Sequence, residues 1–583
     1  MRLARRQSGT DNNTAGSTYP ITGVGQFGVQ PRLEIRQLQQ NVDQFNLYIL
    51  ALQRMMQADE DDLLSHYSIA GIHGRPYVPW NNLKVQGVAG GYCQHTANVF
   101  LPWHRPYMLL YEQVLQQYIV EIVNTFPTGV TRRRYAQAAL EWRLPYWDWA
   151  MDPLDTPSMI PSIVQQPTVQ VTLPNGTATI DNPLYAYTFH PSAPLEAFYW
   201  TPYNEWQSTI RAPTNKTSYA TSQDSVSSQN VYAVHTMLKD RLYSLFTNYG
   251  NFTQFGNQAS LNHDSQHSDS LEKLHNVVHD KSGSQGTMTF LEFSAHDPLF
   301  FLHHTFIDRC FALWQALYPD SWVEPMDAVE STMMVLAGQS VDADSPLWPF
   351  STDEKATWFT SNSVRDWTTW GYTYPELVDG WTPASVRSAI NKLYGNSASN
   401  LIVNKRDTNA ANVPGWLVNG KRSEYTVNID MDMSAINGTF TVYLFLGDFD
   451  SRDPTCWPTE ANLVGVDSSF GGFKDANTAD EARTPVIVSG SVPLTTKLLK
   501  KVDSGELFSM EESEVEHYLT ENLQWRLTGG DGTEITSDQV TGLVVSVVAN
   551  NVTPACSADE FPAWGTAKAL HNATQGRLGG AAA

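Results

Sequence analysis

The clearest patterns of apolar positions in the first part of the chain have the period of an α-helix. From Ile35 to Met56 the apolar residues alternate spacings of three and four, which places them on one face of an amphipathic helix. A second pattern runs from Tyr107 to Ile122, with Pro106 suited to the first helical turn. The two apolar faces comprise Ile35, Leu38, Val42, Phe45, Ile49, Leu52 and Met56, and Tyr107, Leu110, Tyr111, Val114, Leu115, Tyr118 and Ile122.

Further along, helical and irregular stretches alternate. Residues 149–230 are rich in Pro, Ser, Thr and Asn, which indicates long loops of the kind that often frame a pocket. Helical patterning resumes from Val231 to Tyr249, around His275 and His279, and again after His304. The core of this region is therefore expected to be mostly helical.

The pattern changes to a period of two beyond a polar, Asn-rich and Ala-rich stretch. This stretch, 396–415, predicts a linker, and Lys405 and Arg406 in its middle make it a candidate protease site. The alternation that follows predicts strands of a β-rich domain with the architecture of a sandwich. The alternating residues are Tyr425, Val427, Ile429, Met431 and Met433; Phe440, Val442, Leu444 and Leu446; Leu523, Trp525 and Leu527; and Leu543, Val545 and Val547.

These patterns divide the chain of 583 residues, which exceeds a single typical core. We expect a first domain over 1–395, with 1–18 flexible, then the linker 396–415. A β-rich domain should follow over 416–560, and a flexible tail over 561–583.

The excess of acidic residues restricts the kinds of molecule that this protein can bind. With 37 basic and 60 acidic residues the net charge is −23, which repels nucleic acid and anionic membrane surfaces and suits a small neutral or cationic substrate. No stretch approaches the ~20 apolar residues that a membrane span needs, and the basic start lacks an apolar signal-peptide core. The sequence as given therefore indicates a cytoplasmic protein, or a secreted one if a signal peptide has been trimmed.

Four cysteines make no disulfide framework, although Cys456 and Cys556 could form one structural pair. Histidine usage is more informative, because 13 of the 15 histidines lie between His66 and His304. That clustering is typical of a metalloenzyme core.

The histidines form two candidate metal sites. His275 and His279, four residues apart, share one helix face, and either His303 or His304 could add a third imidazole. A second set comprises His73, His95 and His104. All-imidazole ligation suits copper, zinc, iron or nickel rather than magnesium, calcium or manganese. Spacing alone does not choose between copper and zinc, but two adjacent three-histidine sites are what a pair of copper ions sharing dioxygen would require.

Seven motifs in a fixed order carry a family resemblance. The chain resembles fungal tyrosinases, which are type-3 copper polyphenol oxidases, over roughly residues 19–395 and more weakly over its β-rich part. The motifs are GIHG (71–74), GYCQH (91–95), WHRPY (103–107), PYWDW (145–149), LEKLHNVVH (271–279), DPLFFLHH followed by DR (297–309) and GYTYPE (371–376).

The resemblance implies a fold and a ligand set. It implies a mainly α catalytic domain, a four-helix bundle with long loops around a dinuclear copper site, plus a C-terminal β-sandwich-like domain. The first copper would be bound by His73, His95 and His104 and the second by His275, His279 and His304, while Cys93 matches the cysteine that forms a thioether with the histidine two residues later.

Neighbouring histidines and aromatic residues receive structural roles. His66 is expected to be structural, His303 to support the ligands or pack beside them, and His296 to lie in a turn or pocket. Trp147, Asp148 and Trp149 should supply core packing and a buried hydrogen bond.

Glu272 and Asn276 bear on the reaction. In the family these two positions together hold a water that takes a proton from a bound monophenol. Such help is needed because a phenol has a pKa of about 10. Both residues are present, which favours hydroxylation of monophenols over oxidation of catechols alone.

The β-rich domain suggests latency. In fungal relatives such a domain covers the active site, inserts an aromatic placeholder and is removed by proteolysis; Phe470 and Phe473, on a Gly-rich loop, are the candidates here. Some relatives carry a Cys-x-x-Cys pair near this loop for copper loading, but residues 474–480 contain no cysteine, which argues against a copper-relay role.

The sequence thus predicts a tyrosinase that is latent until a protease cuts it. It would use two copper ions and dioxygen to convert monophenols and o-diphenols to o-quinones, leading to melanin-type pigments. The alternatives are a catechol oxidase without monophenolase activity and a haemocyanin-like dioxygen carrier, which the absence of tandem repeats disfavours. The sequence leaves the oligomeric state and the preferred phenol open.

Overall fold

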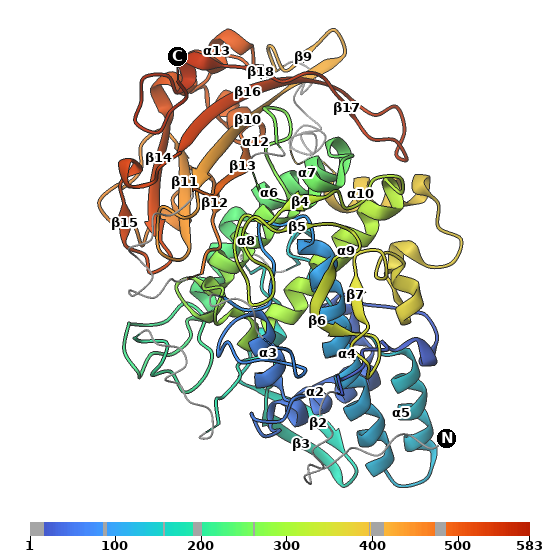
Figure 1. The fold of residues 1–583 in the computed structure, drawn as a ribbon. Coiled ribbons are helices and arrows are strands. Elements are labelled where there is room, and N and C mark those ends of the chain that lie inside the picture. Colours follow the sequence, from blue (N-terminus) through green and yellow to red (C-terminus); the bar gives the residue numbers. More distant parts are fainter. Residues whose placement is uncertain are drawn as a thin grey trace.

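Helices form most of the first part of the chain, as the spacing of its apolar residues predicts (Figure 1). The structure, a computed structural model, describes residues 17–84, 90–154, 158–190, 201–259, 263–395, 397, 413–472 and 485–582. The helices are α1 (Ile35–Gln40), α2 (Val42–Met56), α3 (His66–His73), α4 (Phe100–Thr125), α5 (Val130–Glu141), α6 (Asp224–Asn248), α7 (Phe252–Gly256), α8 (Leu271–Gly283), α9 (Leu299–Leu317) and α10 (Pro383–Tyr394).

Short strand pairs connect and cover these helices. A β-hairpin of β2 and β3 lies in the long segment that the sequence assigned to loops and short extended pieces. The strands of this part are β1 (Gln30–Pro31), β2 (Thr168–Leu173), β3 (Gly176–Asp181), β4 (Met326–Asp327), β5 (Ser340–Val341), β6 (Pro346–Ser351), β7 (Trp358–Thr360) and β8 (Tyr372–Thr373).

Two helix boundaries differ from the sequence prediction. The first predicted helix is broken at Asn41, whose backbone leaves the helical region at φ −91° and ψ 80°, and the next residue, Val42, is 70% exposed instead of buried. In α4, Pro106 lies inside the helix instead of in its first turn. Burial of Phe100 and Trp103 extends this helix toward its N-terminus and outweighs the backbone hydrogen bond that proline cannot donate.

A buried carboxylate ties the helical core together. Asp308 on α9 accepts hydrogen bonds from Arg105 on α4 (Oδ1, 2.6 Å) and from Arg32, Tyr372 and Tyr374 (Oδ2, 3.1, 2.7 and 2.6 Å). Burial by itself raises the pKa of this carboxyl, but the two guanidinium groups outweigh it and hold the pKa below its usual value. The Tyr-x-Tyr element at 372–374 is thus joined to the helix that carries His304.

The C-terminal part forms two antiparallel sheets, as expected for the predicted β-sandwich-like domain. One sheet has the order β13-β10-β16-β17, with β9 on β10 and β18 on β16; the other has the order β12-β11-β14-β15. Its elements are β9 (Leu417–Val418), β10 (Lys421–Asp432), β11 (Phe440–Leu446), β12 (Leu463–Ser468), β13 (Ile487–Pro493), α12 (Thr495–Ser504), α13 (Glu512–Asn522), β14 (Leu523–Gly529), β15 (Glu534–Ile535), β16 (Val544–Thr553), β17 (Ala563–Trp564) and β18 (Lys568–Ala569).

The expected linker and tail are described unequally. Most of 396–415, including Lys405 and Arg406, lies outside the described residues. In the expected tail, β17 and β18 pair with β16, and Leu570 and Ala573 are buried. This segment therefore packs on the sheet up to residue 582. Cys456 and Cys556 are exposed free thiols, so the disulfide considered from the sequence is wrong.

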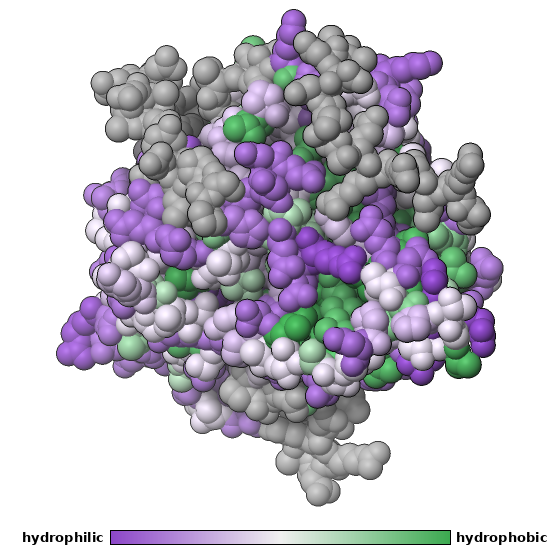
Figure 2. All heavy atoms as spheres, turned by 90° about the horizontal axis from the view of Figure 1, so that it is seen from below, coloured by the Kyte–Doolittle hydropathy of each residue, from purple (hydrophilic) through white to green (hydrophobic). Residues whose placement is uncertain are grey.

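One face of the molecule can be compared by hydropathy in Figure 2. On the face shown in Figure 2, hydrophilic residues predominate and hydrophobic ones form small patches between them. Within the described ranges, none of the helices combines the length and the apolar character that crossing a membrane requires.

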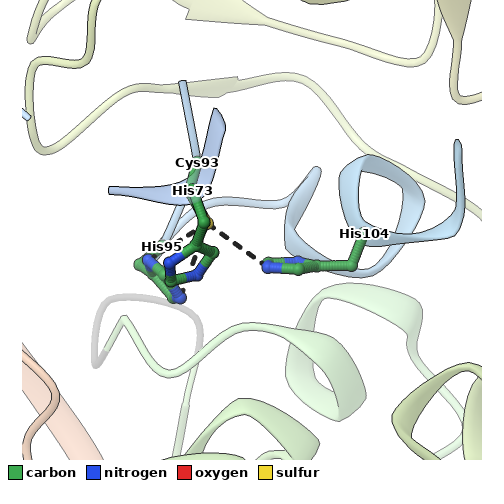
Figure 3. Close-up of side chains that lie close together, drawn as sticks. All are labelled: His73, Cys93, His95 and His104. Atoms are coloured by element: carbon green, nitrogen blue, oxygen red, sulfur yellow. Dashed lines mark hydrogen bonds between the residues drawn. The ribbon is translucent and has the colours of Figure 1, made fainter. Parts of the chain in front are cut away.

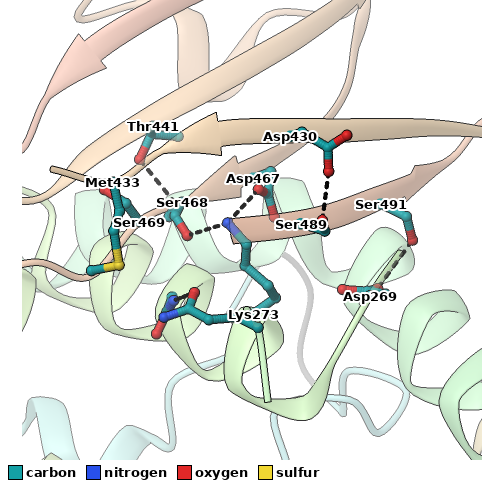
Figure 4. A network of polar contacts seen from close by, with 12 residues as sticks. Asp269, Lys273, Asp430, Met433, Thr441, Asp467, Ser468, Ser469, Ser489 and Ser491 are labelled. Atoms are coloured by element: carbon teal, nitrogen blue, oxygen red, sulfur yellow. Dashed lines mark hydrogen bonds and ion pairs between the residues drawn. The ribbon is translucent and has the colours of Figure 1, made fainter. Parts of the chain in front are cut away.

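Buried ion pairs join the two parts of the molecule where β12 and β13 lie over α6 and α8 (Figures 1 and 4). Asp467 on β12 accepts from Lys273 on α8 (Oδ2, 2.7 Å) and from Arg241 on α6 (Oδ1, 3.2 Å), and Arg241 also pairs with Asp269 at 2.7 Å. All four side chains are at most 3% exposed. A Cβ at Gly490 on β13 would lie only 2.3 Å from Asp467 Oδ1, so this close approach requires glycine.

Removing this carboxylate should destabilise the protein strongly. In Asp467→Ala, Lys273 stays buried without its partner, and we expect the free energy of unfolding to fall by about 3 kcal/mol. Urea denaturation followed by tryptophan fluorescence measures the change. The control is Asp450→Ala, which breaks the solvent-exposed pair with Arg452 and should leave the urea midpoint unchanged. Equal midpoints for both variants would contradict the prediction.

Candidate metal centre

The first histidine set comes from two helices and the loop between them. His73 is the last residue of α3, and His104 lies in α4. Ser65 caps the N-terminus of α3, because its side chain accepts a hydrogen bond from the backbone N of Ser68. His95 lies in the loop that precedes α4. This loop approaches the end of α3 so closely that a Cβ at Gly91 would lie 2.2 Å from the carbonyl oxygen of His73.

The first set is compact and buried (Figure 3). His73, His95 and His104, together with Cys93, offer ligand atoms that all lie within 4.8 Å of one another. Cys93 Sγ lies 3.4 Å from His95 Nδ1 and 3.3 Å from His104 Nε2. This places the thiol against the His95 ring, as a crosslink between Cys93 and His95 requires.

The second set comes from two adjoining helices. His275 and His279 share one face of α8, and His304 projects from α9, with its Nε2 atom 3.2 Å from His275 Nε2 and 3.3 Å from His279 Nε2. The two sets face each other, because the His104 and His304 rings stack at 4.5 Å between centroids and His95 and His275 stack at 5.7 Å. The space between the two sets, called the chamber below, can therefore hold two ions side by side.

Hydrogen bonds orient four of the rings. The Nδ1 atoms of His73, His104 and His279 contact the backbone oxygens of Leu291, Phe100 and Met288 at 3.2, 2.8 and 3.0 Å. His275 Nδ1 contacts Asn276 Oδ1 at 2.9 Å. Since a carbonyl or amide oxygen only accepts, each of these Nδ1 atoms carries the proton and each Nε2 presents a lone pair to the chamber.

The chemistry of this donor set fits copper. His73 Nε2 is buried and has no hydrogen-bond partner among the described residues, as expected of a metal ligand. Burial lowers the pKa of His73 and of His275 to about 3, so both rings are neutral near pH 7, and metal binding requires neutral imidazole. A set of neutral imidazoles without a carboxylate suits copper.

The structure separates His303 from His304. Trp149 Nε1, which can only donate, lies 3.1 Å from His303 Nδ1, so a neutral His303 carries its proton on Nε2 and has no lone pair left for an ion. His304 Nε2 is the atom that meets His275 and His279. The geometry therefore favours His304 as the ligand and His303 as a support.

The other residues singled out from the sequence lie around the centre. Both ring nitrogens of His66 are engaged, at 3.1 Å from Tyr111 Oη and at 2.9 Å from the His296 carbonyl oxygen, so His66 is structural. His296 ends a short 3-10 turn before α9. Trp147 and Trp149 are fully buried, and Asp148 accepts from Tyr394 Oη at 2.6 Å, which confirms the predicted packing and buried hydrogen bond.

Glu272 and Asn276 lie on α8 beside the second set, joined by a residue that the sequence did not reveal. Gln258 Oε1 accepts from Asn276 Nδ2 at 2.9 Å, and Gln258 Nε2 donates to Glu272 Oε1 at 3.2 Å. Burial raises the pKa of Glu272 to about 8, although hydrogen bonds from the backbone N of Thr96 and of Gln258 oppose the shift. Gln258 follows α7 in a segment without periodic patterning, so no sequence signal pointed to it.

An aromatic side chain of the C-terminal part reaches the chamber. Phe470 follows β12, is fully buried and stacks on His279, with 4.3 Å between ring centroids and 20° between ring planes. It also meets His95 and His275 edge-on, each at 5.6 Å. The alternative, Phe473, lies outside the described residues.

A helical core with two facing histidine sets, joined to a sheet-rich second part, defines a dinuclear copper protein. Comparison with known families agrees: the common central domain of tyrosinase matches residues 64–317, and the tyrosinase C-terminal domain matches residues 424–547. The chain belongs to the tyrosinase family, whose members are copper oxidoreductases that act on phenols.

Individual relatives resemble the whole chain. A tyrosinase of Podospora anserina is 35% identical over 564 residues, which cover 85% of this chain and 96% of that protein. A tyrosinase of Neurospora crassa is 31% identical over 650 residues, covering 92% and 94%. The solved structure of recombinant mushroom tyrosinase superposes with a TM-score of 0.78 at 26% identity, covering 95% of this chain and 98% of that one.

Exchanging each member of the His303 and His304 pair should distinguish ligand from support. We expect His304→Asn to retain about one copper ion per chain after reconstitution, because the second set loses a ligand. His303→Asn should retain about two, because its ring contacts Trp149 and not the ion. Metal analysis of the purified variants gives both numbers, and the reverse outcome would assign the ligand to His303.

Proposed function

We propose that this protein is a tyrosinase that o-hydroxylates monophenols and oxidises o-diphenols to o-quinones, and that its C-terminal domain keeps it latent until a protease cuts the chain. His73, His95 and His104 would bind one copper ion and His275, His279 and His304 the other. When bound, the copper pair supplies the activation of dioxygen. Two o-diphenols each lose two electrons and two protons to become quinones, and these reduce one dioxygen to two waters. In the hydroxylation, one oxygen atom of dioxygen enters the ring and the other leaves as water, so that a monophenol and dioxygen give one o-quinone and one water. The quinones would then feed melanin-type pigments.

The observation that carries the proposal is the position of Phe470. Its ring lies face to face with His279 and edge-on to His275, both of the second set, and edge-on to His95 of the first, so an aromatic ring fits against ligands of both sets. A phenol ring has the same shape and would stack on the same imidazole. Phe470 therefore stands where a substrate ring would bind, as a placeholder does.

Proton transfer would be the task of Glu272 and Asn276. A phenol with a pKa of about 10 binds a metal better once it has lost its proton. Glu272 is a buried carboxyl whose raised pKa suits it to exchange a proton near neutral pH. Asn276 contacts His275 directly and can orient a water between the phenol and the carboxylate.

Latency would require the C-terminal domain to stay attached until it is cut. The ion pairs of Asp467 with Lys273 and Arg241 hold β12 on the catalytic part, and Phe470 follows that strand by two residues. A protease acting in the linker 396–415, with Lys405 and Arg406 as its predicted target, would remove the covalent connection.

Shortening Phe470 should activate the uncut protein. In Phe470→Ala the site gains room for a substrate ring while the interface ion pairs remain, so catechol oxidation by the full-length chain should rise at least about tenfold. Oxygen uptake with catechol measures the effect, and proteolysed wild type and variant should differ little. The control is Phe508→Ala, since Phe508 belongs to the same domain but is 82% exposed. An uncut Phe470→Ala chain as inactive as wild type would refute the plug.

Glu272 should matter for monophenols and not for catechols. In proteolysed Glu272→Gln, we expect tyramine hydroxylation to fall about hundredfold because the proton acceptor is lost, whereas catechol turnover should change less than about threefold. Glu272→Asp keeps the charge and should lose less. Activity of the wild type on catechol alone would indicate a catechol oxidase, and reversible dioxygen binding without turnover after proteolysis would indicate a haemocyanin-like carrier.

A further inference from the structure

Gln258 is a buried polar residue next to the metal centre, and its side-chain amide lies between Glu272 and Asn276. Its carbonyl oxygen accepts from Asn276 Nδ2 at 2.9 Å. Its amide nitrogen donates to Glu272 Oε1 at 3.2 Å and to Thr96 Oγ1 at 2.8 Å. Gln258 thus uses its donor and its acceptor together, and its side chain is fully buried.

The backbone around Gln258 holds the amide in place. Its backbone N donates to Glu272 Oε2 at 3.1 Å, and the backbone N of Thr96 donates to Glu272 Oε1 at 2.6 Å. The following residue is held too, because the backbone N of Ala259 donates to Asn257 Oδ1 at 2.9 Å. These hydrogen bonds are internal to the catalytic part, whereas the backbone carbonyl oxygen of Gln258 accepts from the backbone N of Ser489 on β13 at 2.9 Å.

The orientation of Asn276 follows from this contact. Because Gln258 Oε1 is an acceptor, it selects the amide rotamer in which Asn276 presents Nδ2 to Gln258 and Oδ1 to His275 Nδ1, at 2.9 Å. The opposite rotamer would set an NH₂ group against the ring N–H of His275 and a carbonyl oxygen against that of Gln258. With a residue that cannot hydrogen-bond at position 258, only the ring N–H of His275 would favour this rotamer, and the Asn276 amide would be held less firmly.

We propose that Gln258 is a positioning residue for monophenol hydroxylation, which holds the Asn276 amide and the Glu272 carboxylate in the arrangement that accepts the phenol proton. This inference rests on the proposed role of Glu272 and Asn276. Within the described residues the Gln258 side chain hydrogen-bonds to Asn276, Glu272 and Thr96 and to none of the six candidate ligands, so it acts through its partners. Catechol oxidation, which demands less of a proton acceptor, does not depend on it.

The test compares two glutamines of one segment in the copper-loaded full-length chain after limited proteolysis. Gln258→Met keeps the length of the side chain and removes its hydrogen bonds. We expect kcat for tyramine to fall about tenfold, with KM for tyramine and kcat for catechol each within about twofold of wild type. The matched control is Gln254→Met, since Gln254 lies on α7 and is partly exposed; its two kcat values should both equal wild type.

Copper content and melting temperature show whether each variant is intact. If Gln258→Met loses copper, Gln258→Glu serves instead: it keeps an acceptor for Asn276 but sets a second carboxyl against Glu272, and should lower the tyramine to catechol ratio of kcat by at least about fivefold. An unchanged ratio in a copper-loaded variant overturns the proposal, as does an equal fall for both substrates, which a purely structural role would produce. The Glu272→Gln variant distinguishes failure of this inference from failure of the proposed function. If Glu272→Gln selectively lowers kcat for tyramine and Gln258→Met does not, only the proposed role of Gln258 fails. If neither does, the proposed proton acceptor fails as well.

Discussion

The structure depends on keeping a cluster of imidazoles neutral and oriented inside a buried core. Six candidate ligands are buried together, and protein oxygens satisfy the second ring nitrogens of four of them. The carbonyl oxygens of Phe100, Met288 and Leu291 do this for His104, His279 and His73. The surrounding helices and loops therefore bring three backbone carbonyl groups to three imidazole rings. The hydrogen bonds of Asp308 fix α4, which carries His104, against α9, which carries His304.

The sequence revealed those parts of the site that have a local signal. Spacing on α8 predicted the pairing of His275 with His279, and strict alternation predicted β10, β11, β14 and β16. Periodicity failed where tertiary contacts decide: Asn41 breaks the first helix, and burial of Phe100 and Trp103 extends α4 past Pro106. Periodicity also carried no sign of contacts between distant segments.

Gln258 illustrates that limit. It lies 14 residues before one partner and 162 residues after another, in a stretch without periodicity, and only the folded chain brings it between Glu272 and Thr96. The same holds for Asp467, 194 residues from Lys273. The family resemblance made Phe470 and Phe473 the candidate placeholders. The structure shows Phe470 stacked on His279, whereas Phe473 lies outside the described residues.

The ion pairs of Asp467 affect the electrostatic field near the second histidine set. If the C-terminal domain departs as proposed, Asp467 leaves with it, and Lys273 becomes a cation without that partner two residues from His275, while Arg241 keeps Asp269. Such an uncovered ammonium group would attract a carboxylate on an incoming phenol at low ionic strength. Opening the site in this way would also remove a negative charge from the surroundings of the second histidine set.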